Sequence, residues 1–380
     1  MLSVRLPVPR FVSAGEVFSG VGSIGVLRAL PAARVAVLAS SSLLQDSVAG
    51  DKLRAAVRAQ DVRFIAAPKG EPSLDTLQPV ITEITEFGPD WIVAAGGGSV
   101  LDGAKIAWAF YEQPDLDPEE AVRPFALPRL RGRARLVAVP TTSGSGSEVS
   151  SAAVFAVHPH HAKKPMVSHE LLPDVVILDP ALTMGVPSAV RIAAGFDALA
   201  HAVEGYASRF DNSLVDLLAE QAVRTLLREL PRSIAEPQDM DARLNVMNAA
   251  MMAGWVQNLK VPGAGHAIAH QLAELGIGHG AATGFMLVPA LRYNCRDETV
   301  RSKYDRLAEA VGLAGADALM DKITQMRRDL AVPNPMTGKR IADRDGLLAA
   351  ALEDVCARAN PRPLDCRALD EILDDAICAA

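Results

Sequence analysis

Several features that define other protein classes are missing from this 380-residue sequence. No stretch approaches the roughly 18 consecutive apolar residues that a membrane span needs. No run of lysine and arginine is long enough to track a phosphate backbone, and the net charge is -7, so nucleic acid is not an expected partner. The opening MLSVRLPVPRFVS lacks the apolar core and cleavage site of a secretory signal. We therefore expect a cytoplasmic protein that acts on a small molecule and binds neither membrane nor nucleic acid.

Cysteine is also scarce. The chain has four cysteines, all in its last quarter and without a CxxC pair: Cys295, Cys356, Cys366 and Cys378. This pattern predicts reduced thiols and no disulfide framework. The composition is instead 49% hydrophobic and 22% charged, which favours a globular chain with a large core.

The organisation of the chain changes near its middle. The first half alternates helical stretches with short apolar runs at residues 33–40, 62–68, 90–99, 135–142 and 174–182. Such runs predict parallel strands covered by helices on both faces. From about Ser188 the sequence reads as long amphipathic helices. We expect an α/β domain with a parallel, Rossmann-like sheet over residues 1–185, followed by an all-α domain over residues 186–380.

The first candidate site is the sequence GGGSVLDGAK at residues 96–105, after an apolar run and at the start of a helical stretch. Glycines let the backbone approach a pyrophosphate, and the amides and positive end of the following helix attract it. Asp102 would then accept hydrogen bonds from the ribose or carboxamide of a cofactor. The spacing is not GxGxxG, so the ordinary dinucleotide fingerprint does not apply, and a tight strand-to-helix turn is the alternative.

The second candidate site is PTTSGSGSE at residues 140–148, where hydroxyls and glycines again follow a strand. Such a loop suits phosphate and ribose contacts, with a flexible surface turn as the alternative. Two loops of this kind after strands of one sheet favour a shared ligand crevice.

The third candidate site lies in the helical half and contains five chemistry-bearing residues: Asp197, His201, His266, His270 and His279. Residues four apart share one helix face, so Asp197 and His201 present an oxygen and an imidazole to the same point. A second helix can present His266 opposite them, and His279 can join from a following turn. One aspartate and three histidines form a ligand set suited to zinc or ferrous iron.

A rival histidine cluster stands at residues 158–161, with the sequence HPHH. Its proline and the neighbouring lysines make it a poor rigid metal site. We interpret it as the solvated tip of a hairpin.

Taken together, GGGSVLDGAK, PTTSGSGSEVS, LLPDVVILDP, GFDALAHAVEGYAS and GHAIAHQL resemble the iron-dependent (group III) alcohol dehydrogenases, whose fold is shared with dehydroquinate synthase. The resemblance runs from about residue 90 to 295. It implies a nucleotide-binding α/β domain, a helical domain, one divalent metal beside a nicotinamide, and a homodimer. It also implies a small alcohol or aldehyde as the substrate.

The resemblance assigns roles to individual residues. The implied metal ligands are Asp197, His201, His266 and His279. His270 matches a histidine near the nicotinamide that does not bind the metal. The implied cofactor contacts are Gly96, Gly97, Gly98, Ser99, Asp102, Thr141, Thr142, Ser147 and Lys163.

Two departures from the family pattern bear on these roles. The segment before His279 is one residue shorter than is usual, and His279 follows Gly278 where the family has a proline. Ser40 stands where many NAD-using relatives carry an aspartate. Without that carboxylate the ribose site can admit a 2′-phosphate, so we expect NADP(H) to be favoured over NAD(H). The expected metal is Fe(II), although the same ligands would hold zinc.

The expected reaction is hydride transfer between the substrate and the nicotinamide. The metal polarises the substrate oxygen, and His270 relays the hydroxyl proton outward. The alternatives are a metal-free enzyme similar to maleylacetate reductase, a cyclising synthase of the dehydroquinate type, and a nucleotide-binding protein with no catalytic activity. The aspartate and three histidines disfavour the first.

Overall fold

The structure is a computed structural model that describes residues 11–45, 47–70, 72–155 and 164–378. It contains two compact units. The sheet unit comprises Ser13–Ala198 and Thr225–Gly254, and the helical unit comprises Met1–Val12, Leu199–Arg224 and Trp255–Ala380. The divisions fall inside three helices, α6 (Ser188–Ala207), α7 (Ser213–Ala235) and α8 (Met240–Lys260). A domain boundary between residues 185 and 186 stays a prediction.

The sheet unit is built on a parallel sheet of six strands in the order β1-β8-β5-β4-β2-β3. The strands are β1 (Glu16–Ser19), β2 (Arg34–Ala39), β3 (Asp61–Ala66), β4 (Trp91–Gly96), β5 (Arg135–Pro140) and β8 (Val175–Leu178). Five of them coincide with the apolar runs of the sequence. The sequence does not predict the β1 strand. The antiparallel pair β6 (Ala152–Phe155) and β7 (Lys164–Val167) flanks residues 158–161, in agreement with the interpretation of that cluster as part of a hairpin, although the tip itself lies outside the described residues. Because all six strands are parallel, their carboxyl ends share one edge, where ligands bind in open α/β sheets.

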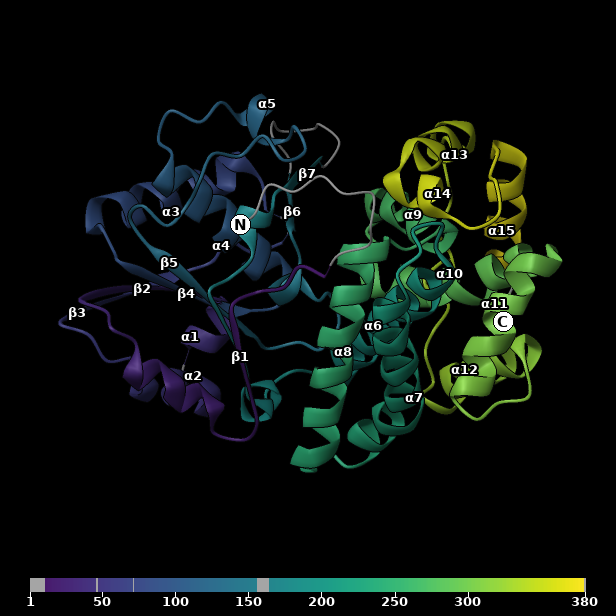
Figure 1. The fold of residues 1–380 in the computed structure, drawn as a ribbon, viewed down its shortest axis with the longest axis horizontal. Coiled ribbons are helices and arrows are strands. Elements are labelled where there is room, and N and C mark those ends of the chain that lie inside the picture. The colour runs from purple at the N-terminus through teal and green to yellow at the C-terminus, as the bar shows by residue number, and fades with distance from the viewer. Residues whose placement is uncertain (1–10, 46, 71, 156–163, 379–380) are drawn as a thin grey trace. The chain divides into compact units, whose positions relative to one another are not determined.

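Both faces of the sheet are covered, as expected (Figure 1). On β2, Ala36 and Leu38 pack against α3 and α4, whereas Val35 and Val37 pack against the 3-10 helix η1 and α2. The described helices that lie wholly in this unit are η1 (Ser23–Ala29), α1 (Ser41–Leu44), α2 (Val48–Ala56), α3 (Leu74–Phe87), α4 (Gly98–Glu112) and α5 (Pro118–Ala121), with 3-10 turns η2 (Ser147–Val149), η3 (His169–Leu171) and η4 (Pro180–Thr183). Burial on both faces explains why the inner strands β2, β4, β5 and β8 are almost wholly apolar, whereas the edge strands β1 and β3 carry exposed polar residues.

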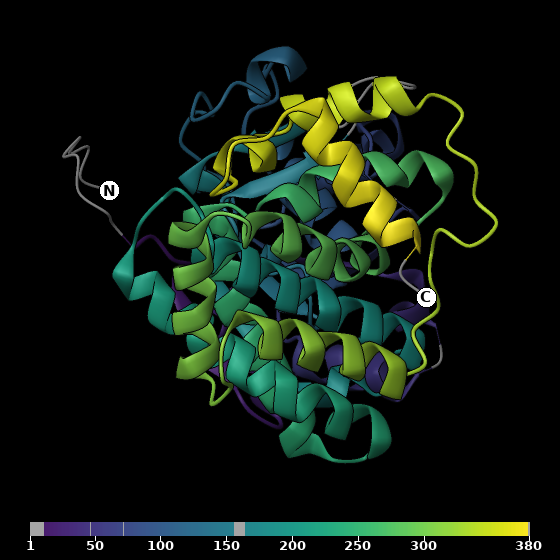
Figure 2. The ribbon, with the colours of Figure 1, turned by 90° about the vertical axis from the view of Figure 1, so that its right-hand side faces the viewer.

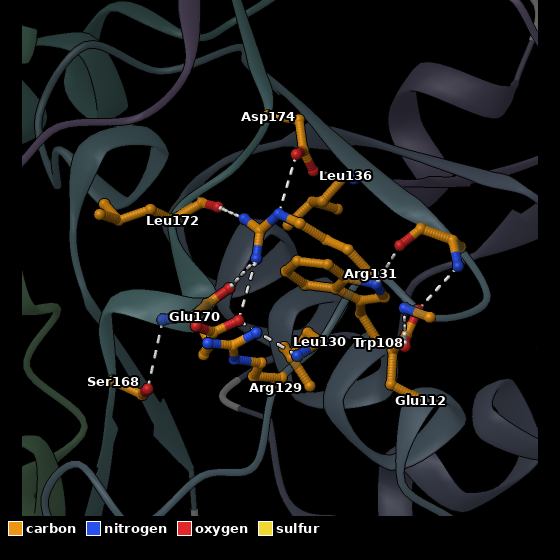
Figure 3. Close-up of polar contacts among 12 residues, drawn as sticks. Trp108, Glu112, Arg129, Leu130, Arg131, Leu136, Ser168, Glu170, Leu172 and Asp174 are labelled. Atoms are coloured by element: carbon orange, nitrogen blue, oxygen red, sulfur yellow. Dashed lines mark hydrogen bonds and ion pairs between the residues drawn. The ribbon is translucent and has the colours of Figure 1, made fainter. Parts of the chain in front are cut away.

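The proline-rich segment between α4 and β5 carries the short helix α5 and is anchored at its end by Arg131 (Figure 3). Arg131 has a left-handed backbone (φ 75°) and lies over the Trp108 ring, 5.0 Å from its centroid. Its Nε donates to Asp174 at 2.8 Å, and Nη1 donates to the carbonyl of Glu170 at 3.0 Å. The carboxylate of Glu112 accepts three backbone N–H groups beside it. These bonds fix the chain just before it enters β5.

Figure 2 shows the stacked helices of the helical unit, in which most of the helices pack against α9 or α10. Its further elements are η5 (Leu272–Leu275), α11 (Glu298–Ala310), α12 (Ala316–Asp329), α13 (Arg344–Glu353), α14 (Val355–Ala359) and α15 (Cys366–Cys378), besides α9 (Ala264–Gln271) and α10 (His279–Asn294). Helices α10, α13 and α14 pack on α9, and α15 packs on α10. No described residue beyond β8 forms a strand, in agreement with the expected all-α second half. No described helix is long and apolar enough to cross a bilayer.

Candidate functional site

Four of the predicted site residues meet at one point. Helix α6 carries Asp197 and His201 one turn apart, α9 carries His266, and α10 begins with His279. One potential ligand atom from each of the four lies within 4.8 Å of all the others. One carboxylate and three imidazoles match the donors that zinc and ferrous iron accept, so the residues fit a divalent transition metal.

The imidazoles are closely packed. The His201 and His266 rings stack with centroids 4.6 Å apart, and the His279 ring lies 5.6 Å from that of His266. The shortened segment before His279 still reaches the cluster, because η5 ends at Gly276 with a left-handed backbone (φ 70°) and the chain turns back into α10. Glycine makes such a turn without strain.

Glu204 supports the cluster and was missed in the sequence. It lies one turn after His201 on α6, and its Oε2 is 2.6 Å from Nδ1 of His266. Its other oxygen accepts the backbone N–H of Gly265 at 2.7 Å. Both side chains of the Glu204–His266 pair are almost fully buried. A carboxylate on Nδ1 fixes the ring and turns Nε2 toward the point where a metal would bind. The only signal in the sequence was an acid three residues after His201.

His270 lies one turn beyond His266 on α9 and pairs with a residue that the sequence did not suggest. Its Nδ1 is 2.8 Å from Oδ2 of Asp354, and its ring stacks on His279 with centroids 5.2 Å apart. Desolvation lowers the pKa of His270, and Asp354 opposes that shift. The side chain keeps 38% of its surface exposed, so its proton can exchange with water. Cys356 lies close enough to His270 and Asp354 for the three to form a second possible metal-ligand set. Its thiol is buried, and desolvation raises its pKa.

The glycine loop occupies the carboxyl end of β4, as predicted. Gly97 is the N-cap of α4 and makes no side-chain capping bond, so the first amides of the helix are placed for an anion. A Cβ on Gly96 would meet Cβ of Val100 at 2.6 Å, and one on Gly98 would meet Oγ of Ser145 at 2.7 Å. The glycines therefore let the first loop pack closely against the second, and they leave the backbone amides of the first loop exposed for a ligand.

Asp102 links the two loops directly. Ser147 Oγ donates to its Oδ1 at 2.5 Å, and the backbone N–H of Val154 donates to its Oδ2 at 3.1 Å. The buried Lys105, one turn further on α4, donates to the carbonyl of Ser147 at 2.6 Å. Burial lowers the pKa of Lys105 to about 8 and raises the pKa of the neighbouring Glu148 to about 7. No role was predicted for Lys105 or Glu148 from the sequence. Their position at the ends of the two small-residue motifs was the signal that could have pointed to them.

The ends of three neighbouring strands carry the remaining predicted cofactor residues. Ser40 follows β2, and its backbone N–H donates to the carbonyl of Ala95 in β4 at 3.1 Å. The backbone N–H of Thr141, after β5, donates to the carbonyl of Gly96 at 2.9 Å. Thr142 lies beside Gly97. Lys163 and the histidine cluster at 158–161 lie outside the described residues.

Comparison with known proteins agrees with this arrangement. Residues 14–180 match the iron-containing alcohol dehydrogenase family, and residues 191–377 match its C-terminal region. The chain is 31% identical to a 1-propanol dehydrogenase of Citrobacter freundii over 95% of this chain and 98% of that protein. It is 29% identical to an NADPH-dependent butanol dehydrogenase of Clostridium saccharobutylicum, over 94% of this chain and 95% of the relative.

A solved structure shares the whole fold. The iron-containing alcohol dehydrogenase of Thermococcus thioreducens superposes with a TM-score of 0.88 at 30% identity, covering 97% of this chain and 99% of the other. The predicted fold class is confirmed. This chain belongs to the iron-containing alcohol dehydrogenase family.

Proposed function

We propose that this protein is a metal-dependent dehydrogenase of small alcohols and aldehydes that exchanges a hydride with a nicotinamide cofactor. The observation that carries the proposal is the convergence of Asp197, His201, His266 and His279 within 4.8 Å. These residues are the proposed ligands. Fe(II) is the proposed metal on the strength of the family, and zinc is the alternative that the same donors accept.

The residues around the proposed metal have separate tasks. When bound, a divalent ion supplies Lewis-acid polarisation of the substrate oxygen, and a nicotinamide supplies or accepts the hydride. Glu204 orients His266 through Nδ1. His270 holds one ring nitrogen toward Asp354 and keeps the other for the hydroxyl proton, which it passes to solvent.

We further propose that the cofactor lies along the carboxyl ends of β2, β4 and β5 and that NADP(H) is preferred. The proposed contacts are Ser40, Gly96, Gly97, Gly98, Ser99, Asp102, Thr141, Thr142, Ser147 and Lys163. Ser40 places no negative charge at the end of β2 to repel a 2′-phosphate. A butanol dehydrogenase among the relatives is NADPH-dependent, which supports the same preference.

A cytoplasmic homodimer is proposed from the family resemblance. Light scattering of the eluted protein in size-exclusion chromatography tests the assembly, and twice the chain mass is the expected result. A monomer at micromolar concentration would contradict it.

The test of the proposed function combines metal analysis with turnover. The purified protein is expected to hold about one divalent ion per chain and to oxidise NADPH in the presence of short aldehydes. Prolonged chelation should remove the ion and the activity together, and added Fe(II) or Zn(II) should restore the activity. Full turnover in the metal-free protein would contradict the proposal.

A further inference from the structure

The sheet unit contains a pocket with two arginines, Arg191 and Arg243, that have no role in the reaction proposed above, although Thr141 and Thr142 of the proposed cofactor loop also line it. It is lined by the loop after β5, the turn η4 and parts of α6, α7 and α8. The residues lining this arginine pocket are Thr141, Thr142, Ser143, Thr183, Arg191, Leu230, Ser233, Arg243 and Val246. Two of them are cationic, five carry hydroxyl groups and none is acidic.

Arg243 is buried at the wall of the pocket, with 4% of its surface exposed. Its Nη1 donates to the carbonyl of Thr183 at 3.0 Å and to the Thr183 hydroxyl at 2.8 Å, and Nε donates to the carbonyl of Pro237 at 2.8 Å. No described residue accepts a hydrogen bond from Nη2. The guanidinium is thus held rigidly while one of its edges remains available to a ligand.

Arg191, on the first turn of α6, also lines the pocket and is partly buried. Its Nη2 donates to the carbonyl of Ser233. Burial and the nearby positive charge of Arg243 lower the pKa of Arg191 to about 10. Neither arginine forms an ion pair with a carboxylate among the described residues. Two like charges near one cavity, without a counter-ion, are costly in a poorly hydrated site.

We propose that the arginine pocket binds a phosphate group between Arg191 and Arg243. Guanidinium groups donate paired hydrogen bonds to oxyanions, and two of them match the double charge of a phosphomonoester or of inorganic phosphate. The hydroxyls that line the pocket supply further donors. Binding would offset the repulsion between the two arginines. The phosphate belongs either to a nucleotide held by the adjoining loop at residues 141–143 or to a free phosphate that acts from this pocket.

Thermal unfolding in inorganic phosphate tests the site without any turnover, so the result does not depend on the proposed dehydrogenase activity. At constant ionic strength, replacing chloride by phosphate should raise the Tm of the wild-type protein. Arg191→Gln should weaken phosphate binding by about tenfold or more. Arg54→Gln is the matched control, because Arg54 is a partly exposed arginine of α2 in the same unit and does not line the pocket.

Phosphate that raises Tm no more than chloride, or that binds Arg191→Gln as tightly as Arg54→Gln, would overturn the proposal. Competition identifies the source of the group. If phosphate competes with NADPH in the wild type and not in Arg191→Gln, the site takes a phosphate of the cofactor. If NADPH and phosphate bind independently and phosphate binding still needs Arg191, the site takes a free phosphate.

Discussion

The two candidate sites are built in different ways. In the helical unit and at the α6 turn that leads into it, the chemistry comes from side chains, with Asp197, His201, His266 and His279 gathered within 4.8 Å. At the sheet edge the candidate chemistry comes mainly from the backbone. Gly97 begins α4, and no side chain caps the N–H groups of its first turn. A site built from side chains should lose its function when one of them is removed. A site built from glycine amides should instead be damaged when a Cβ is added to a glycine.

The largest effect is expected from His266→Ala. Removing a central imidazole should release the metal and lower kcat/KM by roughly 10⁴ or more, because several kcal/mol of transition-state stabilisation disappear. Metal analysis and steady-state kinetics are the measurements. His169→Ala is the control, since His169 pairs with Ser151 outside the cluster and should retain the ion.

His270→Ala should keep the metal and slow turnover by roughly 10² to 10⁴, the usual range for a positioned acid or base. The combination of normal metal content and low kcat distinguishes this residue from the ligands. If the metal is lost as well, His270 is itself a ligand and the role of His279 must be reassigned.

Glu204→Gln should leave the fold intact and weaken metal binding by about 10- to 100-fold, because the carboxylate that orients His266 becomes a neutral amide. Competition with a chelator measures the affinity. Glu229→Gln, another buried carboxylate, should bind metal as the wild type does. Equal affinities in the two variants would show that Glu204 acts only in packing.

Gly96→Ala tests the backbone site by adding one methyl group. The new Cβ would lie 2.6–2.8 Å from the stiff side chain of Val100, so we expect a loss of about 1–3 kcal/mol in stability and weaker NADPH binding. Unfolding in urea and NADPH fluorescence are the measurements. Gly185→Ala, where no described atom lies within 4 Å of the added Cβ, should change neither.

The smallest effect is expected from Ser40→Asp. A carboxylate at the end of β2 would repel a 2′-phosphate and accept the ribose hydroxyls of NAD(H), shifting the kcat/KM ratio toward NADH by about tenfold. The ratio is measured for both cofactors in both proteins. A wild type that strongly favours NADH, with no change in the variant, would show that Ser40 does not face the ribose.

Local patterns in the sequence predicted most of the fold. Apolar runs identified β2, β4 and β5 because strands buried on both faces carry few polar residues. Helical spacing predicted that Asp197 and His201 share a face, since residues four apart always do. The HPHH segment indicated a hairpin between β6 and β7, but the bounds of these four-residue strands were not predicted because so short a strand carries too little pattern.

The sequence by itself therefore determined the fold class, the candidate metal ligands and the positions of the two glycine-rich loops, because each rests on short local motifs in the chain. Only the tertiary structure decided which residues hydrogen-bond to these candidate site residues. Glu204 meets His266 across 62 residues and Asp354 meets His270 across 84, and no periodicity links residues so far apart. The same holds for Arg191 and Arg243, which line one pocket only because α6 and α8 pack against the loop after β5.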